Sequence, residues 1–493
     1  DTRSTGKFGT GFMSTLVLSR VVNFSGDVQT NDGIMGFDVT IYRDGLNKVE
    51  LEQGVTKMEE SLKKHPERKN LTTFEYILKT KNSKNAYDYG LISLKSNVGP
   101  VLIYNPTIES ITIKTTKETC IYRANHEEGN VQTISVTTTD AKQQKLTNKS
   151  MTFVMFDSIQ KYKESKDVYI NCLLQIDDNN EIAFKVDPDV LFISYPLFFG
   201  YDQFRSPILI NSPSFEPGSE RDSIIIQSIP KKNEEEDEFI ESNESLINKF
   251  ILTNTIDLFK QILSFILDMN CTKLYNLAAG LRSGSKNEFL QENFYVKMRE
   301  VLLSFPIFET ASGLKKSEEV LMPSIKSYEI FRDYNKDDKK LNDKNKQHYA
   351  DFYRLVYQLS IDDKYVINYK SCKEWQSKSW VSFPSQISIQ EFIEFISKHE
   401  KVSDLKVIDT NEIDEELFIT QNTSTRSNEN DNNNIDSISV STDSTSLSCS
   451  CPIVGPESNF IKNVIVFIEQ LRDCDTIFKE NNILINGKGR FVS

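Results

Sequence analysis

Apolar residues at the start of the chain are spaced as in a helix and then as in strands. Helical spacing is shown by four residues that follow a glycine-rich opening: Phe12, Met13, Leu16 and Val17. The next apolar run, 21–24, predicts a strand that ends at Gly26, and residues 37–41 alternate apolar with polar up to a turn at Asp44 and Gly45. Residues 73–78 are another strand candidate, and the apolar runs 101–104 and 108–113 flank a turn at Asn105 and Pro106. Residues 1–115 are therefore predicted to form helix plus mixed sheet.

Strand character continues to about residue 230. The β-rich runs are 133–139, 151–156, 168–175, 182–186, 208–210 and 224–226. We interpret residues 116–230 as a second α/β unit, and the charged run 231–237 as a solvated boundary.

Helical periodicity takes over after that boundary. One helix face is lined by apolar residues that we interpret as core: Leu258, Phe259, Ile262, Leu263, Ile266 and Leu267. A mostly helical domain is predicted for 240–410, beginning near Asn243. Residues 421–451 are mainly Asn, Ser, Thr and Asp, which predicts a disordered linker that proteases cut first. A last helix, 460–471, and short strands complete residues 455–493, so the fold class is α+β.

Composition narrows the class of protein. The 493 residues are 38% hydrophobic, which is enough for packed cores, and the net charge of -13 argues against a broad nucleic-acid-binding surface. The sequence has no uninterrupted run of 18 apolar residues and no signal region at its start, so we expect no membrane span. Seven scattered cysteines predict reduced thiols in a cytoplasmic protein. With four histidines in the chain, all far from the Cys449–Cys451 pair, no zinc site is expected.

Three closely spaced glycines, Gly6, Gly9 and Gly11, precede the first predicted helix. Glycines let the backbone adopt conformations that side chains forbid, so successive N–H groups can point at one anion, and the helix N-terminus adds its dipole. This GxxGxG spacing is not a P-loop, because Lys7 is followed by Phe8, and it reverses the dinucleotide GxGxxG. On spacing alone, a glycine-rich turn that caps a helix is the other interpretation.

The residues around the glycines favour the phosphate-binding interpretation. The stretch GKFGTGFMSTLVLSRVVNFSG resembles the second glycine box of the GHKL ATPase superfamily, most closely its heat-shock-chaperone and sacsin-like branch. The resemblance covers roughly residues 1–230. It implies the C-terminal part of a Bergerat-type α/β sandwich, then a transducer-like α/β domain. It also implies that the box contacts the phosphates of ATP through these residues: Gly6, Lys7, Phe8, Gly9, Thr10, Gly11 and Phe12.

Further positions follow from the same resemblance. Thr72, with Thr73 as the next choice, matches a threonine near the adenine end of the pocket, although an ordinary strand threonine would look the same. The transducer-like region offers Arg221 as a γ-phosphate contact, with Arg205 and Lys185 as weaker candidates; a surface ion pair of Arg221 with its acidic neighbours is the alternative. The terminal stretch 486–491 faintly resembles a sacsin-branch motif, but a tight turn between strands explains it better.

GHKL enzymes place a general-base Glu, a Mg²⁺-binding Asn and an adenine-binding Asp box ahead of this glycine box. Five residues precede Gly6 here, so the catalytic half, including the Mg²⁺ ligands, is expected upstream. The resemblance implies a chaperone-like, ATP-driven module with client or partner proteins and a homodimer as one possible assembly. A non-catalytic interaction scaffold of the same fold is the alternative, and ATP-gated DNA handling is disfavoured by the charge. This chain alone is expected to be inactive.

Overall fold

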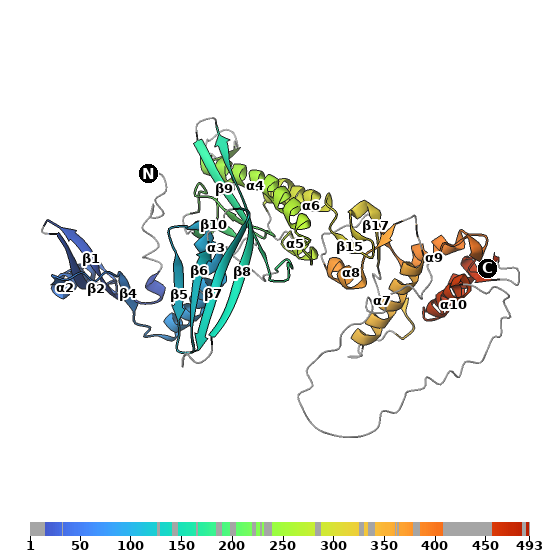
Figure 1. The fold of residues 1–493 in the computed structure, drawn as a ribbon, viewed down its shortest axis with the longest axis horizontal. Helices are drawn as coiled ribbons and strands as arrows, with labels where there is room; N and C mark the ends of the chain where they lie inside the picture. The colour runs from blue at the N-terminus through green and yellow to red at the C-terminus, as the bar shows by residue number, and fades with distance from the viewer. Residues whose placement is uncertain are drawn as a thin grey trace, which may run out of the picture. The chain divides into compact units, whose positions relative to one another are not determined.

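The structure is a computed structural model whose elements fall in two compact units (Figure 1). Unit 1 comprises Asp1–Asn179, Lys185–Phe204 and Ile208–Leu258, and unit 2 comprises Asn180–Phe184, Arg205–Pro207 and Phe259–Ser493. Within them the structure describes residues 15–31, 33–125, 129–140, 146–163, 166–183, 190–197, 204–218, 223–226, 229–230, 239–281, 287–324, 330–333, 341–359, 361, 364–377, 385–407, 456–485 and 490–492.

A small antiparallel sheet with strand order β3-β2-β1-β4 begins unit 1. Its strands are β1 (Val21–Thr30), β2 (Gly33–Tyr42), β3 (Lys63–His65) and β4 (Thr73–Tyr76). A 3-10 turn, η1 (Thr15–Val17), comes before β1, and helix α2 (Lys48–Ser61) lies between β2 and β3. Asn47 caps α2 by accepting a hydrogen bond from the Glu50 N–H.

Helix α3 (Lys81–Tyr104) leads to the main sheet of unit 1. It starts at a capping box in which the Thr80 hydroxyl accepts from the Ser83 N–H, and it continues through Pro100. Only its second half is largely buried, because Gly99 lets the helix approach the ring of Phe153 closely.

The main sheet has eight strands in the order β11-β10-β12-β9-β8-β7-β6-β5. In chain order these are β5 (Ser110–Lys114), β6 (Glu118–Asn125), β7 (Val131–Asp140), β8 (Leu146–Tyr162), β9 (Lys166–Ile176), β10 (Leu191–Ile193), β11 (Tyr195–Pro196) and β12 (Leu209–Asn211). The β10–β12 pair is parallel and the others are antiparallel. A separate short pair, β13 (Ile229–Pro230) and β14 (Phe239–Ile240), follows.

Helices α3 and α4 (Asn243–Asp268) cover opposite faces of this sheet. Gly99 of α3 lies against Phe153, whereas Phe250 of α4 makes a ring contact with Tyr162, and residues an odd number apart on one strand face opposite sides. By length and composition α4 could cross a membrane, but half of its most apolar window is buried inside the protein. We therefore interpret α4 as a core helix.

Unit 2 combines short helices with two- and three-stranded sheets. Its helices and helical turns are α5 (Tyr275–Ala279), the π-helix η2 (Phe289–Tyr295), α6 (Val296–Leu303), η3 (Ser317–Glu319), α7 (Leu341–Gln358), α8 (Tyr369–Gln376), α9 (Ile389–Ser397), η5 (Val402–Asp404), α10 (Pro456–Glu469) and α11 (Cys474–Glu480). Its strands are β15 (Phe308–Thr310), β16 (Gly313–Lys315), β17 (Val320–Pro323), β18 (Tyr365–Val366), β19 (Gln386–Ile387), β20 (Leu484–Ile485) and β21 (Phe491–Val492). β17 lies between β18 and β19, parallel to both.

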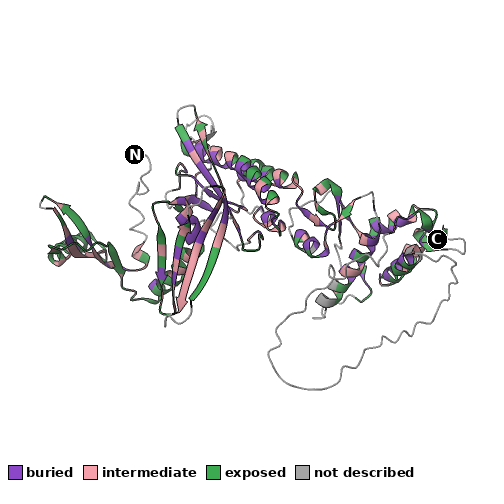
Figure 2. Cartoon of the chain, in the orientation of Figure 1, coloured by how far each residue is buried: buried purple, intermediate pink, exposed green. Residues whose placement is uncertain are grey.

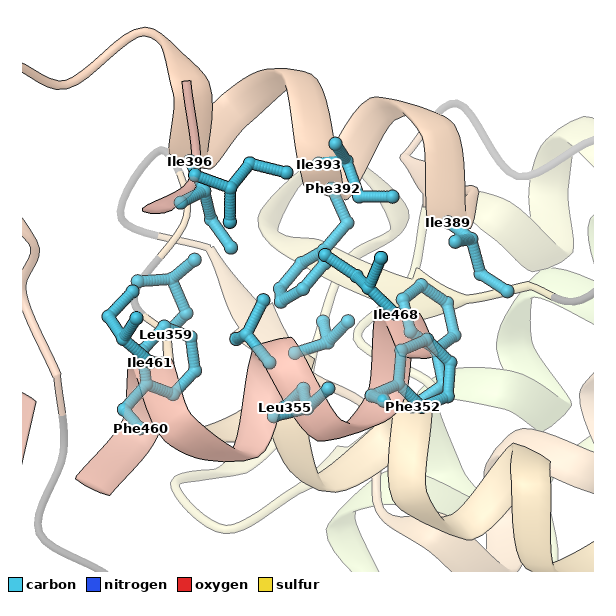
Figure 3. Packing of buried hydrophobic residues seen from close by; sticks show 14 of the residues in the cluster. Phe352, Leu355, Leu359, Ile389, Phe392, Ile393, Ile396, Phe460, Ile461 and Ile468 are labelled. Carbon is cyan, nitrogen blue, oxygen red and sulfur yellow. The ribbon is translucent and has the colours of Figure 1, made fainter. Parts of the chain in front are cut away.

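The C-terminal helices belong to the same hydrophobic core as α7 and α9. Figure 3 shows Phe460, Ile461 and Ile468 of α10 packed among side chains of those two helices, Phe352 and Phe392 included. All five side chains are buried. Residues 456–492 therefore complete a core that begins at Leu321, across a sequence gap of 48 residues after Val407.

The α+β class is confirmed, and so are the strand in 37–41 and the start of the helical region at Asn243. The helix predicted for 460–471 is present as α10, but it is not the last one, because α11 follows it. Three local predictions were wrong. The small sheet of residues 21–76 is antiparallel and not mixed. β1 does not end at Gly26 but runs to Thr30, because Gly26 pairs with Phe37 and leaves room for its ring. Residues 101–104 are the last turn of α3, because tertiary packing of this run overrides the breaking tendency of Gly99 and Pro100.

Other predictions concern residues outside the description or are not tested by it. The linker 421–451, the charged run 231–237 and the turn 486–489 lie outside the described residues. Of the run 182–186, residues 184–186 lie outside the described residues, and an isolated bridge at Glu181 lies directly before the run. The domain boundary at residue 115 stays a prediction, as do the other boundaries.

A cut in the 408–455 stretch should leave the two fragments associated. A protease site introduced between residues 421 and 451 should give fragments that co-elute in gel filtration, since five apolar α10 residues remain buried in the shared core. Phe467→Ala should weaken this association by about 3–5 kcal/mol, whereas Val466→Ala on the exposed side should not. Separation of the wild-type fragments after cleavage would contradict the shared core.

Two glycines of α3 should respond in opposite ways to alanine. A Cβ on Gly99 would lie 2.9 Å from Phe153 Cζ, so Gly99→Ala should destabilise unit 1 by about 1–3 kcal/mol. A Cβ on Gly90 meets nothing within 4 Å, so Gly90→Ala should stabilise it by up to about 1 kcal/mol through helix propensity. Chemical denaturation of both variants measures this, and the same sign for both would show that Gly99 is not a packing position.

Candidate functional site

The predicted phosphate loop, from Gly6 to Phe12, lies outside the described residues. The first described element is η1, directly downstream of it. Leu18 and Ser19 donate backbone hydrogen bonds to the Thr15 carbonyl at 3.0 and 3.2 Å. The guanidinium of Arg43, at the end of β2, contacts this turn.

Thr72 lies immediately before β4 and is exposed. Its Oγ1 lies over Gly26 of β1, 3.5 Å from the point that a Cβ there would occupy. Thr72 makes no hydrogen bond with the residues that the structure describes, so its hydroxyl is open to a ligand. Thr73 is also exposed and starts β4 opposite Ser25.

A carboxylate holds the loop that leads to Thr72. Asp27 Oδ1 accepts from the Lys69 N–H at 2.7 Å, and Asp27 Oδ2 accepts from the Asn70 N–H at 3.0 Å. Asn70 has a φ of 58°, a left-handed conformation that asparagine tolerates better than most residues. Asp27 thus offsets the strain of the loop that fixes the position of Thr72.

A second carboxylate, Asp38, lies on the same sheet. Its Oδ2 is 3.1 Å from Lys69 Nζ and 2.7 Å from His65 Nε2. Hydrogen bonds from Lys69 and from His65 lower the pKa of the Asp38 carboxyl. Lys69 is therefore paired within the sheet and is not the phosphate-binding cation of this surface.

The small sheet has very little core of its own (Figure 2). Among the described residues between Val17 and Leu94, Val22 is the one hydrophobic side chain that is buried. More than half of the exposed large hydrophobic side chains in the described chain lie in this stretch. Phe24 stacks on Phe74 with ring centroids 4.6 Å apart, yet Phe74 remains 45% exposed. A sheet of this size is not stable unless its apolar face is packed against something.

One edge of the small sheet is protected from pairing with other strands, and the other edge is open. β3 forms one edge and carries Lys63 and Lys64, which protect it from pairing with other strands. β4 forms the other edge, and its outer side has no partner strand among the described residues. Leu71 and Ile77 beside it are exposed.

The predicted γ-phosphate contacts are Arg221, Arg205 and Lys185. Arg221 and Lys185 lie outside the described residues. Arg205 belongs to unit 2, whereas Thr72 belongs to unit 1. The Arg205 backbone N–H donates to the Tyr295 hydroxyl at 2.9 Å, and burial raises the pKa of Tyr295 to about 12.

Unit 2 contains a polar cavity that the sequence analysis did not identify. It has a volume of about 380 Å³ and is lined by Arg332, Asp333, Lys344, Gln347, His348, Asp351 and Gln470. Four of these residues lie on one face of α7 at i, i+3, i+4 and i+7, which is the signal that could have pointed to it. Arg332, Asp333 and Gln470 come from distant positions that only packing brings together.

His348 is the centre of this cluster. Its Nε2 is 2.8 Å from Asp333 Oδ1, its Nδ1 is 3.2 Å from Gln470 Oε1, and its ring stacks on Phe331 with centroids 3.9 Å apart. Both ring nitrogens are therefore engaged, so His348 links α7 to the end of α10 and is not placed to act as a general base. Lys344 Nζ lies 3.5 Å from Asp333 Oδ2.

Metal binding has little support in the described part of the chain. No group of three or more His, Cys, Asp or Glu side chains there could hold a metal ion. The described residues thus offer an exposed Thr72 beside a carboxylate-braced loop, and a separate structural His–Asp pair.

The Asp333 contact predicts how the stability of unit 2 depends on pH. Burial alone would raise the pKa of Asp333, but hydrogen bonding and electrostatic attraction from His348 and Lys344 outweigh burial and lower it. The stabilisation is present above the unfolded pKa, about 3.9, and is lost as the pH falls through the folded value. In urea unfolding, Asp333→Asn should lower the free energy of unfolding by about 0.5–1 kcal/mol at pH 7 and by less below pH 4. The effect is small because the Asp333 side chain is partly exposed to solvent. A cost that does not change with pH would contradict the pairing.

Comparisons with known proteins add no relative. No protein-family model, no curated protein and no solved structure matches this chain. The family resemblance therefore rests on the sequence motifs, and the function is argued from them together with the geometry of the small sheet.

Proposed function

We propose that residues 1–115 are the C-terminal half of a GHKL-type, Bergerat-fold ATP-binding domain. Residues 116–230 act as its transducer-like domain, and residues 240–410 respond to the nucleotide state. The module is chaperone-like and cytoplasmic, and it acts on client or partner proteins, with a homodimer as one possible assembly. The motif GKFGTGF supplies the family assignment.

The incomplete core between Val17 and Leu94 is the structural observation that supports this proposal. A half-domain should expose the apolar face and the strand edge that its other half would cover. The small sheet has both features: a partly open cluster of Phe24, Phe37 and Phe74, and a β4 edge that no described strand pairs with. A complete small domain would bury these rings.

ATP fits the described residues in part. The exposed Thr72 hydroxyl could accept or donate a hydrogen bond at the adenine end. The nearby carboxylates Asp27 and Asp38 would repel phosphate, so we assign the phosphates to the main-chain N–H groups of Gly6–Gly11. Mg²⁺ would neutralise charge on the phosphates, and we place its ligands upstream, with the general base.

ATP binding should depend on the glycines and on upstream residues. In a protein extended upstream to include the expected Glu, Asn and Asp box, isothermal titration should detect ATP binding. Gly9→Val should abolish it, because a β-branched side chain blocks the approach of backbone to phosphate. Gly90→Val is the matched control, since a Cβ there meets nothing within 4 Å, and it should bind normally.

Two results would overturn the proposal. Equal ATP affinity of the Gly9→Val and Gly90→Val proteins would exclude the phosphate loop. Steady ATP turnover by the 493-residue chain would exclude an upstream catalytic half. Tight binding without hydrolysis by the extended protein would favour the non-catalytic scaffold instead.

A further inference from the structure

One face of the main sheet is uncovered where β5, β6, β7 and β8 lie side by side. Helix α3 packs on the other face of these strands: Gly99 lies against Phe153, and Lys95 forms an ion pair with Glu118. Alternate residues of a strand point to opposite faces, so the register assigns the remaining positions. The face away from α3, called the open face below, carries Ser110, Thr112, Lys114, Thr119, Ile121, Arg123, Asn125, Thr133, Ser135, Thr137, Thr139, Leu146, Asn148, Ser150 and Thr152.

Burial differs between the two sides of these strands. On the α3 side, Ile113, Cys120 and Ile134 are buried, whereas every residue of the open face is half-buried or exposed. Further along β8 the side that continues the open face is covered again, because Val154 is buried and Tyr162 contacts a ring of α4. The open face is therefore a bounded surface and not a whole side of the sheet.

Short polar side chains dominate the open face. Most of its residues are Ser, Thr or Asn, which lose less conformational entropy on contact with a partner than Lys, Arg, Gln or Glu would. Its two charged residues, Lys114 and Arg123, are exposed cations that form no ion pair with a described residue. It carries no aromatic ring on which a nucleobase could stack. These properties suit a protein partner.

Charges of opposite sign lie at the two ends of one row across the strands. Arg123 of β6 is opposite Ser135 of β7, which is opposite Ser150 of β8. The Ser150 hydroxyl donates to Asp178 Oδ1 at 3.0 Å, so Asp178, just after β9, occupies the next position of the row. Arg123 and Asp178 are thus three strand spacings apart, about 14 Å.

We propose that two copies of this chain associate through the open face. A two-fold axis parallel to the strands, between β7 and β8, places Arg123 of each copy over Asp178 of the other and Ser135 over Ser150. An acidic partner protein would attract Arg123 but repel Asp178, so the row is complementary to itself and not to a partner of one charge. The proposal concerns residues 110–178 and does not depend on nucleotide binding.

The size of the open face sets the strength of the association. Neighbouring strands lie about 4.8 Å apart and residues on one face repeat about every 6.8 Å, so the open face covers roughly 500 Å². Two copies would bury about 1,000 Å², which is the lower limit for a specific interface. Hydroxyl groups exchange hydrogen bonds with water for hydrogen bonds with the partner, so each contributes little net free energy. We therefore expect a weak, reversible dimer.

Sedimentation equilibrium of the 493-residue chain tests this interface. Wild-type protein should be mainly monomeric near about 10 µM and increasingly dimeric toward about 1 mM. Arg123→Glu brings like charges together in both symmetry-related contacts, and so does Asp178→Arg, so each should raise the dissociation constant about tenfold or more. Lys149→Glu is the matched control, because Lys149 is an exposed residue of β8 on the α3 side, and it should dimerise like wild type.

Mixing the two single variants identifies the contact. Each Arg123→Glu chain is complementary to an Asp178→Arg chain, so an equimolar mixture should form heterodimers with the affinity of wild type. The double variant Arg123→Glu/Asp178→Arg exchanges both charges and should self-associate. If a charge reversal prevents folding, Arg123→Gln and Asp178→Asn should each still weaken the dimer. Wild-type protein that stays monomeric at about 1 mM, single variants that dimerise like wild type, or a mixture without heterodimers would each overturn the proposal.

Discussion

Hydrophobic burial is the constraint on which the rest of the structure depends, and it is met unevenly along the chain. The main sheet of unit 1 has α3 on one face and α4 on the other, and its strand β9 is largely buried. The small sheet has one short helix, α2, which buries Gly54 and leaves Val49, Leu51 and Val55 exposed. Burial drives folding roughly in proportion to apolar area, so this stretch gains little stability from its own packing. The sparse core of this stretch is the observation on which the proposed half-domain rests.

Unit 2 meets the same constraint by using distant parts of the chain. Its core joins α7 and α9 to α10, and contacts at the C-terminal end of α10 fix the register of that helix. Phe331 pairs with Leu471, Arg332 donates to the Leu471 carbonyl, and His348 reaches Gln470. Because His348 uses both ring nitrogens in these contacts, the polar cavity beside it is better explained by assembly of the core than by catalysis.

Sequence reasoning succeeded where a local pattern agreed with tertiary packing. The alternation in β2 and the start of α4 at Asn243 were both predicted from local apolar patterns, and α4 buries one face. It failed where packing overrides local preference. Gly90, Gly99 and Pro100 disfavour a helix, yet they lie inside the 24-residue helix α3. Of the candidate site, Thr72 stays a prediction from its motif. Three sets of contacts could not be predicted: those of Asp27 with the loop 69–70, those of Arg43 with the turn 15–19, and those around His348. Each joins residues that only the fold brings together.

The most direct test of the incomplete domain is native-state hydrogen exchange, comparing β1 with β9 in the same molecule. If residues 15–94 are half of a domain, β1 amides of the 493-residue chain should exchange through openings of near-zero free energy, while those of β9 stay protected by the global stability of unit 1. Extension of the chain upstream should then protect β1. Full protection of β1 in the 493-residue chain, equal to that of β9, would contradict the account.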